Sequence, residues 1–160
     1  MRIVVADTGP IHYLVLIGQD EILPALFEKV IIPSVVRDEL VRAQTPEAVR
    51  EWIQAPPAWL EVHPRPNSPF NADLESLDEG ERAALALVVF LGADLLLMDD
   101  REGVRTARNK GFRVIGTLRV LQLAAERRLL NLADSFERLK RTNFRYRQEI
   151  LDRLLDSSVG

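Results

Sequence analysis

Three short runs of this sequence are apolar at every position, and segments with helical character separate them. The runs are Ile3–Ala6, Val30–Ile32 and Leu95–Met98. A strand that is apolar on both faces must be covered by helices on both sides, which is the usual environment of a parallel sheet. The pattern therefore predicts an α/β fold with right-handed crossover connections.

The other elements follow from turn residues and from helical periodicity. Two further strands are predicted at 59–63, where apolar and polar residues alternate, and at 112–115. The strongest helix signal runs from Glu81 to Leu91, and Gly92 can end that helix. A loop containing several prolines is expected at 65–71. The remaining helical segments are expected at about 11–17, 21–27, 33–41, 46–54, 101–110, 118–128, 132–141 and 147–155.

Length and composition restrict the class of protein. A chain of 160 residues, 47% of them hydrophobic, is long enough for one domain with its own core and too apolar for a disordered chain. The chain has no cysteine, which excludes a disulfide framework, a thiolate zinc site and a cysteine nucleophile. Only two histidines are present, which disfavours a metal site built from histidine.

No segment has the character of a membrane span or a secretion signal. The longest apolar run, 83–93, is 11 residues long, whereas a transmembrane helix needs about 18 or more. Asp7 interrupts the first apolar run before it reaches the length of a signal-peptide core. We therefore expect a soluble cytoplasmic protein without a membrane partner.

The small net charge of −3 is the sum of two opposite halves. Residues 1–100 carry 7 basic and 17 acidic side chains, and residues 101–160 carry 14 basic and 7 acidic ones. Such an asymmetry is typical of an interaction surface, here one for a polyanion, although solvated helix faces would give the same count.

Five carboxylates lie at positions that a parallel sheet would bring to one edge. Asp7 follows the first strand, and Asp99 and Asp100 follow the strand at 95–98. Glu39 lies in the helix after the second strand, and Glu81 lies in the first turn of the helix before the strand at 95–98. Sites of open α/β sheets lie at the carboxyl ends of the strands, so these acids are candidates for one pocket.

Each acid also has an ordinary structural role open to it. Asp7 could cap the next helix, and Glu39 could pair with Arg42 three residues later. Asp78 and Glu81 have the spacing of a capping box, and Asp99 or Asp100 could cap the helix that begins at Arg101. Such local roles do not explain why the acids recur at one edge of the sheet.

If the acids converge, their mutual repulsion constrains what they bind. Two like charges about 4 Å apart repel by about 4 kcal/mol at an effective dielectric constant near 20. Several carboxylates stay ionised together only when a cation neutralises them; otherwise their pKa values rise. A site made of oxygen ligands favours Mg²⁺ or Mn²⁺, and such ions promote phosphodiester hydrolysis.

The basic segment after the aspartate pair is suited to a phosphate backbone. Arg101, Arg105 and Arg108 are spaced i, i+4 and i+7, which places them on one helix face. Aromatic side chains are scarce in the basic tail, with Phe144 and Tyr146 inside it, so no platform for base stacking is predicted.

Four segments, in order, resemble the motifs of the PIN-domain nucleases: VVADTGP, IIPSVVRDEL, LDEGERAALALV and LLLMDDREGVRTA. The similarity covers about 1–130 and is closest to small prokaryotic members, including VapC-type toxins and related uncharacterised nucleases. It implies a three-layer α/β/α sandwich with a central, mainly parallel sheet of about five strands. We expect a nuclease domain at 1–145, with 146–160 as a helical tail of the same domain.

The resemblance also assigns site residues. It implies that acids at four positions bind Mg²⁺ or Mn²⁺ for RNA cleavage, the fourth being Asp99 or Asp100. Thr8 is the hydroxyl residue often found beside the first acid, and we group it with the three arginines as substrate-binding. The implied catalytic residues are Asp7, Glu39, Glu81, Asp99 and Asp100, and the implied metal ligands are Asp7, Glu81, Asp99 and Asp100.

The resulting functional hypothesis is a metal-dependent endoribonuclease that hydrolyses single-stranded RNA. By resemblance it would be the toxin of a toxin–antitoxin pair, inhibited by an antitoxin protein, and a homodimer. The alternative is a catalytically degenerate PIN fold that binds RNA or protein. A receiver-like phosphoacceptor is disfavoured because the acidic pair follows a late strand, and a dehydrogenase because no G-x-G-x-x-G follows the first strand.

Overall fold

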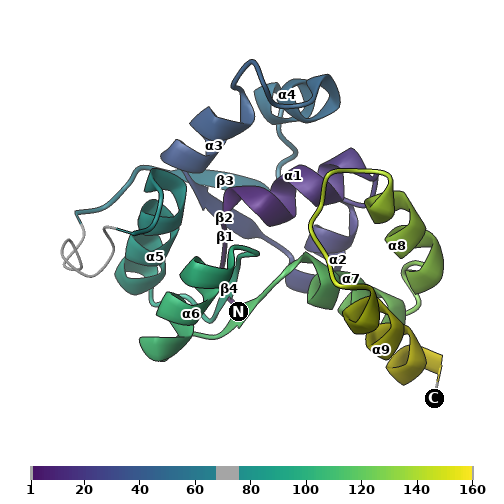
Figure 1. Cartoon of the computed structure of the whole chain (residues 1–160). Coiled ribbons are helices and arrows are strands. Elements are labelled where there is room, and N and C mark those ends of the chain that lie inside the picture. Colours follow the sequence, from purple (N-terminus) through teal and green to yellow (C-terminus); the bar gives the residue numbers. More distant parts are fainter. Residues whose placement is uncertain (1, 68–75, 160) are drawn as a thin grey trace.

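A parallel sheet runs through the centre of the molecule, as Figure 1 shows. It has five strands. The computed structural model describes residues 2–67 and 76–159. The strand order is β3-β2-β1-β4-β5, and every neighbouring pair is parallel. The strands are β1 (Val4–Ala6), β2 (Val30–Pro33), β3 (Leu60–His63), β4 (Leu95–Leu97) and β5 (Val114–Ile115). The predicted α/β class with a parallel sheet is therefore confirmed.

The two faces of the sheet bury alternate residues in two separate cores. Val4, Ala6 and Leu97 belong to the larger core, whereas Val5 and Leu96 belong to the smaller one. Because successive side chains of a strand point to opposite faces, a strand buried on both faces has to be apolar at each position. The apolar runs in the sequence have this physical origin.

Helices cover both faces and complete the three-layer α/β/α sandwich. On one side, α5 (Glu79–Leu91) and α6 (Arg101–Asn109) supply Leu87 and Ala107 to the smaller core. The larger core is covered by α1 (Thr8–Leu16), α2 (Ile22–Phe27), α3 (Ser34–Leu40), α4 (Glu47–Gln54), α7 (Thr117–Glu126), α8 (Leu132–Lys140) and α9 (Gln148–Val159).

The predicted elements are all present, and their ends differ by a few residues. The largest shift at a start is in α1, which begins at Thr8 rather than at residue 11. Pro10 is accommodated there because the first turn of a helix needs no backbone N–H donor. The last helix extends beyond the predicted 147–155 to Val159. In the predicted loop at 65–71, residues 65–67 have no regular secondary structure, and 68–71 lie outside the described residues.

The last helix packs on the body of the fold. α9 contacts α7 and α8, and its Leu151 is 1% exposed and belongs to the larger core. Figure 1 shows α9 lying beside α7 and α8 at the end of the chain. Within the described ranges, no helix has the length and apolar character needed to cross a membrane.

Candidate active site

Asp7 lies where β1 ends, at the carboxyl edge of the sheet. Its backbone N–H donates to the carbonyl of Leu97 at 2.9 Å, which continues the pairing of β1 with β4. Its side chain is buried, and burial is the main reason why the pKa of Asp7 rises to about 7. The charges of Asp78, Glu39 and Asp99 raise this pKa further, while a hydrogen bond from the backbone of Thr8 lowers it. Four acids therefore share one electrostatic environment.

Asp99 follows β4, the strand next to β1, and two hydrogen bonds fix its carboxylate. The backbone N–H of Thr117 donates to Oδ1 at 2.7 Å, and the Thr117 hydroxyl donates to Oδ2 at 2.6 Å. Burial raises the pKa of Asp99, and the two bonds from Thr117 lower it. Thr117 begins α7 and is completely buried. Thr117 was not among the predicted site residues; its signal in the sequence is a hydroxyl side chain two positions after the last strand.

Two glycines leave room for the Asp99 carboxylate. A Cβ atom on Gly116 would lie 2.7 Å from Asp99 Oδ1, and one on Gly9 would lie 3.1 Å from Oδ2. Since neither glycine has a positive φ, the close approach of the carboxylate explains why a side chain fits poorly at these positions.

Asp100, although adjacent in sequence, has a different environment. Its carboxylate accepts a hydrogen bond from the backbone N–H of Gly103 at 2.9 Å and caps α6. Asp99 interacts with Asp7, and Asp100 interacts with Glu81. The helix-capping role considered for this aspartate pair belongs to Asp100.

Glu39 reaches the acids from α3 and is oriented by Thr8. The Thr8 hydroxyl donates a hydrogen bond to Glu39 Oε2. A Cβ atom on Gly80 would lie 2.6 Å from Glu39 Oε1, so the start of α5 approaches this carboxylate closely. Thr8, predicted to bind substrate, thus has an acid of the site as its side-chain partner.

Glu81 combines the capping role with a buried, partly unpaired carboxylate. Its backbone N–H donates to Asp78 Oδ1 at 2.8 Å, and its own Oε1 accepts from the Asp78 N–H at 3.3 Å, which completes the capping box. Its Oε2 is buried and has no hydrogen-bond partner in the part of the chain that the structure describes. Burial, followed by contacts with Asp78 and Asp100, raises the pKa of Glu81 to about 9.

Asp78 is the acid that sequence analysis did not assign to the site. It is the first of the charges that raise the pKa of Asp7, and it is also hydrogen-bonded to Glu81. Its only signal in the sequence was the capping-box spacing. That spacing explains why Asp78 caps α5, but it does not predict that Asp78 lies near Asp7.

Comparison with known proteins identifies the family. The model of the DUF3368 family, a PIN domain, matches residues 3–159. The chain belongs to this family. The predicted PIN membership is confirmed, and PIN domains are in general nuclease folds. No curated protein matches the chain in sequence.

A solved structure supports the same fold. It is that of a PilT N-terminus domain protein, SSO1118, from the hyperthermophilic archaeon Sulfolobus solfataricus P2. The TM-score is 0.53 and the sequence identity 17%, and the match covers 91% of this chain and 99% of the other. At this identity the similarity concerns the fold of the PIN domain.

The donor set of the PIN domain suits a hard divalent cation. All candidate ligands are carboxylates, and the buried Glu81 Oε2 has no hydrogen-bond partner among the described residues. The pKa values of Asp7 and Glu81 are raised, and a nearby cation would lower them. Within residues 2–67 and 76–159, however, no three His, Cys, Asp or Glu side chains are arranged so that they could hold a metal ion. The chemistry of the site fits Mg²⁺ or Mn²⁺, while the described arrangement is more open than a finished coordination sphere.

The predicted arginine stripe on α6 separates into different environments. Arg101 lines a cavity together with Asp99 and Asp100. Arg105 lies 3.8 Å from Glu102, and Arg108 donates to the carbonyl of Val114 at 3.4 Å. Of the three arginines, Arg101 is thus the one placed beside the acids.

We call this space the arginine cavity. It has a volume of about 900 Å³ and lies between the carboxyl edge of the sheet and the chain from α8 to α9. Its lining residues are Tyr13, Asp99, Asp100, Arg101, Gly116, Leu118, Arg119, Asn143, Phe144, Arg145, Tyr146, Arg147, Ile150 and Leu154. Three aromatic side chains therefore gather here. The sequence predicts fewer aromatic side chains at this place, because Tyr13 lies far from the basic tail along the chain.

Proposed function

We propose that this PIN domain is a metal-dependent endoribonuclease that hydrolyses phosphodiester bonds of single-stranded RNA with Mg²⁺ or Mn²⁺. The observation that carries the proposal is the pair Asp7 and Asp99. These carboxylates follow neighbouring strands and lie at the carboxyl edge, and the charge of Asp99 raises the pKa of Asp7. Asp99 also lines the arginine cavity. Acids that would bind cations thus lie next to basic groups that would bind phosphates.

We assign the roles of the residues from the resemblance to PIN-domain nucleases, together with the contacts that each residue makes. Asp7, Glu81, Asp99 and Asp100 would hold the cation, and Thr117 fixes the carboxylate of Asp99 by two hydrogen bonds. When bound, the cation polarises a phosphoryl oxygen and makes a water molecule more acidic. Glu39, which Thr8 orients, completes the acidic wall, and Arg101 is available for a phosphate of the RNA.

Cleavage of a labelled single-stranded RNA tests the proposal. The full chain should cleave the RNA with Mn²⁺ or Mg²⁺ and not with EDTA, and Asp99→Asn should lower the rate by about 100-fold or more. Glu137→Gln is the matched control because Glu137 is an exposed acid on α8 that pairs with Lys140. Equal rates for Asp99→Asn and the parent protein would overturn the assignment.

A catalytically degenerate PIN fold that binds RNA or protein is the second candidate. The open arrangement of the acids, with no three described ligands placed for a metal ion, favours it. Isothermal titration with Mn²⁺ separates the two candidates. Binding that Asp7→Asn weakens supports the nuclease, and no binding at millimolar Mn²⁺ supports the degenerate fold.

From the resemblance to VapC-type toxins, we further propose that an antitoxin protein inhibits this PIN domain. We also propose that the PIN domain forms a homodimer. Co-expression with the product of the neighbouring gene, followed by purification and the RNA cleavage assay, tests the first point. Light scattering of the purified chain tests the second, where a mass near 18.1 kDa would mean a monomer.

A further inference from the structure

The geometry points to the arginine cavity as the site that holds the RNA strand, with Arg145 and Arg147 on its phosphates and Tyr146 stacked on a base. This inference rests on the proposed function and adds the residues that would bind the substrate outside the acidic centre. It assigns a binding role to the chain between α8 and α9, which motif comparison left without one.

The chain between α8 and α9 is held in place by Tyr13 of α1. The Tyr13 hydroxyl donates to Asn143 Oδ1 at 2.8 Å, and the rings of Tyr13 and Phe144 pack edge to face with centroids 5.0 Å apart. The Thr142 hydroxyl accepts a hydrogen bond from the Phe144 N–H at 3.1 Å and donates to the carbonyl of Leu139 at 2.6 Å. These contacts fix the start of the segment that carries Arg145. The backbone that leads to this arginine is therefore held in place at the cavity.

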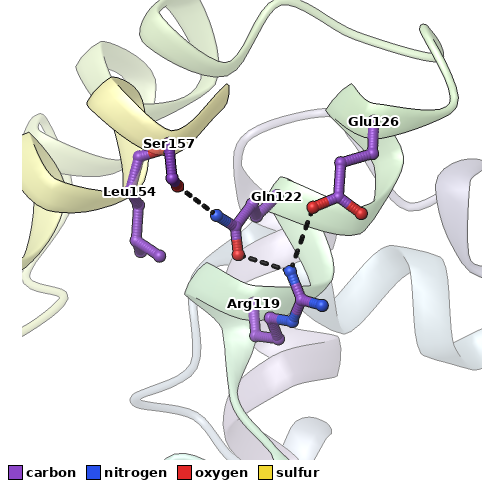
Figure 2. A network of polar contacts seen from close by, with 5 residues as sticks. All are labelled: Arg119, Gln122, Glu126, Leu154 and Ser157. Atoms are coloured by element: carbon purple, nitrogen blue, oxygen red, sulfur yellow. Dashed lines mark hydrogen bonds and ion pairs between the residues drawn. The ribbon is translucent and has the colours of Figure 1, made fainter. Parts of the chain in front are cut away.

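Beyond this segment, the C-terminal part of α9 is fixed by its contact with α7. Figure 2 shows Gln122 of α7 between the two helices: its Nε2 donates to Ser157 Oγ at 2.9 Å, and its Oε1 accepts from Arg119. The Ser157 hydroxyl in turn donates to the carbonyl of Leu154 at 3.0 Å. Because this network holds α9 against α7, Leu154 forms a fixed wall of the cavity.

The charges of the cavity suit a polyanion that approaches the acids from this side. Arg101, Arg145 and Arg147 are exposed, and none of them forms an ion pair within the described residues. Arg119 differs because it is paired with Glu126 at 3.3 Å. Three arginines that have no acidic partner among the described residues can neutralise phosphates without first breaking an ion pair there.

The basic and acidic parts of the cavity meet at Tyr13. Burial and the charge of Asp99 raise the pKa of the Tyr13 hydroxyl, and the charge of Arg145 lowers it. Tyr13, Asp99 and Arg145 all line this one cavity, so a strand held there by Arg145 would pass close to Asp99.

Tyr146 supplies a surface for a base. It is 39% exposed, lines the cavity and lies between the two arginines in sequence. Proteins that bind single-stranded nucleic acid combine a basic groove with aromatic side chains on which bases stack. The cavity of about 900 Å³ is at the upper end of the range of ligand sites, about 300–1,000 Å³.

Fluorescence anisotropy with a short labelled single-stranded RNA tests the inference. The full chain is titrated in EDTA, which prevents cleavage, at KCl concentrations from about 50 to 200 mM. The double variant R145A/R147A should bind at least about tenfold more weakly and lower the slope of log K against log salt by about 1.4, since each phosphate contact on a single strand contributes about 0.7. Tyr146→Ala should weaken binding by about tenfold with an unchanged salt slope.

Two further variants serve as controls. Arg153→Ala removes an exposed arginine of α9 that does not line the cavity, and it should leave affinity and slope within about twofold of the parent. R145K/R147K should keep most of the salt slope because the charge is retained. The inference is overturned if R145A/R147A matches the parent in affinity and slope, or if Arg153→Ala weakens binding as much.

The same proteins separate this inference from the proposed nuclease activity. If R145A/R147A binds and cleaves RNA like the parent while Asp99→Asn does not cleave, the nuclease stands and the binding site is wrong. If binding depends on Arg145 and Arg147 but no cation supports cleavage, the binding site stands and the nuclease is wrong.

Discussion

Asp7 is a buried carboxylate among other carboxylates, and this position has a cost for the metal-free protein. Its pKa rises from 3.8 to about 7 on folding, so between these values the folded state binds more protons than the unfolded state. By linkage, stability falls as the pH rises from about 4 to about 7 and stays low above that range. The buried charge of Asp7 therefore lowers the stability of the metal-free protein at neutral pH, and the cation that we propose for this site would offset that cost.

Asp7→Asn should consequently stabilise the protein at pH 8 in EDTA. Asparagine removes the buried charge and keeps an oxygen to accept from the Thr8 backbone, so we expect a gain of a few kcal/mol and a melting temperature roughly 5–10 °C higher. Thermal unfolding followed by circular dichroism measures this, and the difference should shrink toward pH 4. Equal melting temperatures of Asp7→Asn and the parent protein at pH 8 would contradict the conclusion that the buried charge of Asp7 lowers stability.

Thr117 acts on the site through Asp99. Thr117→Val keeps the shape of the side chain but removes the hydroxyl that donates to Asp99 Oδ2. We expect RNA cleavage to fall by about tenfold or more and the free energy of unfolding to fall by about 1 kcal/mol. Thr117→Ser should restore cleavage because it restores the donor. A Ser variant as inactive as the Val variant would indicate a packing role in place of the hydrogen bond.

At the scale of elements, the first turn of α5 is shared between helix stability and the site. Asp78 and Glu81 cap the helix, and the lack of a side chain at Gly80 lets Glu39 approach. Glycine inside a helix lowers its stability by about 0.5–1 kcal/mol relative to alanine. We therefore attribute the presence of Gly80 to the close approach of Glu39.

Gly80→Ala should therefore separate stability from activity. The new Cβ would displace the end of Glu39 and weaken its hydrogen bond from Thr8, whereas the helix would gain propensity. Because these two effects oppose each other, we expect little change in stability to urea but at least about a tenfold loss of RNA cleavage. Gly92→Ala is no suitable control because Gly92 has a positive φ of 63°; a surface change such as Glu137→Gln serves instead. Full activity of Gly80→Ala would show that the position of Glu39 does not matter for the reaction.

At the scale of the whole molecule, the last helix belongs to the core that covers one face of the sheet. Leu151 of α9 is almost completely buried there, next to the helices that carry Phe136 and Val120. The arginine cavity depends on the same packing, because Leu154 and Ile150 of α9 form part of its wall. The tail at 146–160 and the wall of the cavity therefore form together when the domain folds.

Leu151→Ala should destabilise the entire domain. Loss of a buried leucine costs about 2–5 kcal/mol, and we expect one cooperative transition at lower urea concentration with an unchanged m-value. A separate early transition that leaves the remaining structure intact would show that 146–160 folds independently. RNA binding in EDTA should be retained below the transition, since Leu151 does not line the cavity.

The sequence by itself determined the sheet, the order of elements and the positions of the acids along the chain. Apolar runs, the Asp78 and Glu81 capping box and the strand-end aspartates are local signals, because each depends on neighbours a few residues away. Because the strand ends of a parallel sheet share one edge, the sequence alone also predicts that Asp7 and Asp99 lie close together.

Only the tertiary structure separated Asp99 from Asp100, placed Asp78 near Asp7 and joined Tyr13 to the segment at 143–147. Each of these depends on how a helix is rotated and docked against the sheet, which is set by packing between residues far apart in sequence. Thr117 holds Asp99 from α7, and Tyr13 holds Asn143 from α1, across 18 and 130 residues respectively. Local patterns carry no information about such contacts, and so the arginine cavity was visible only once the helices were packed.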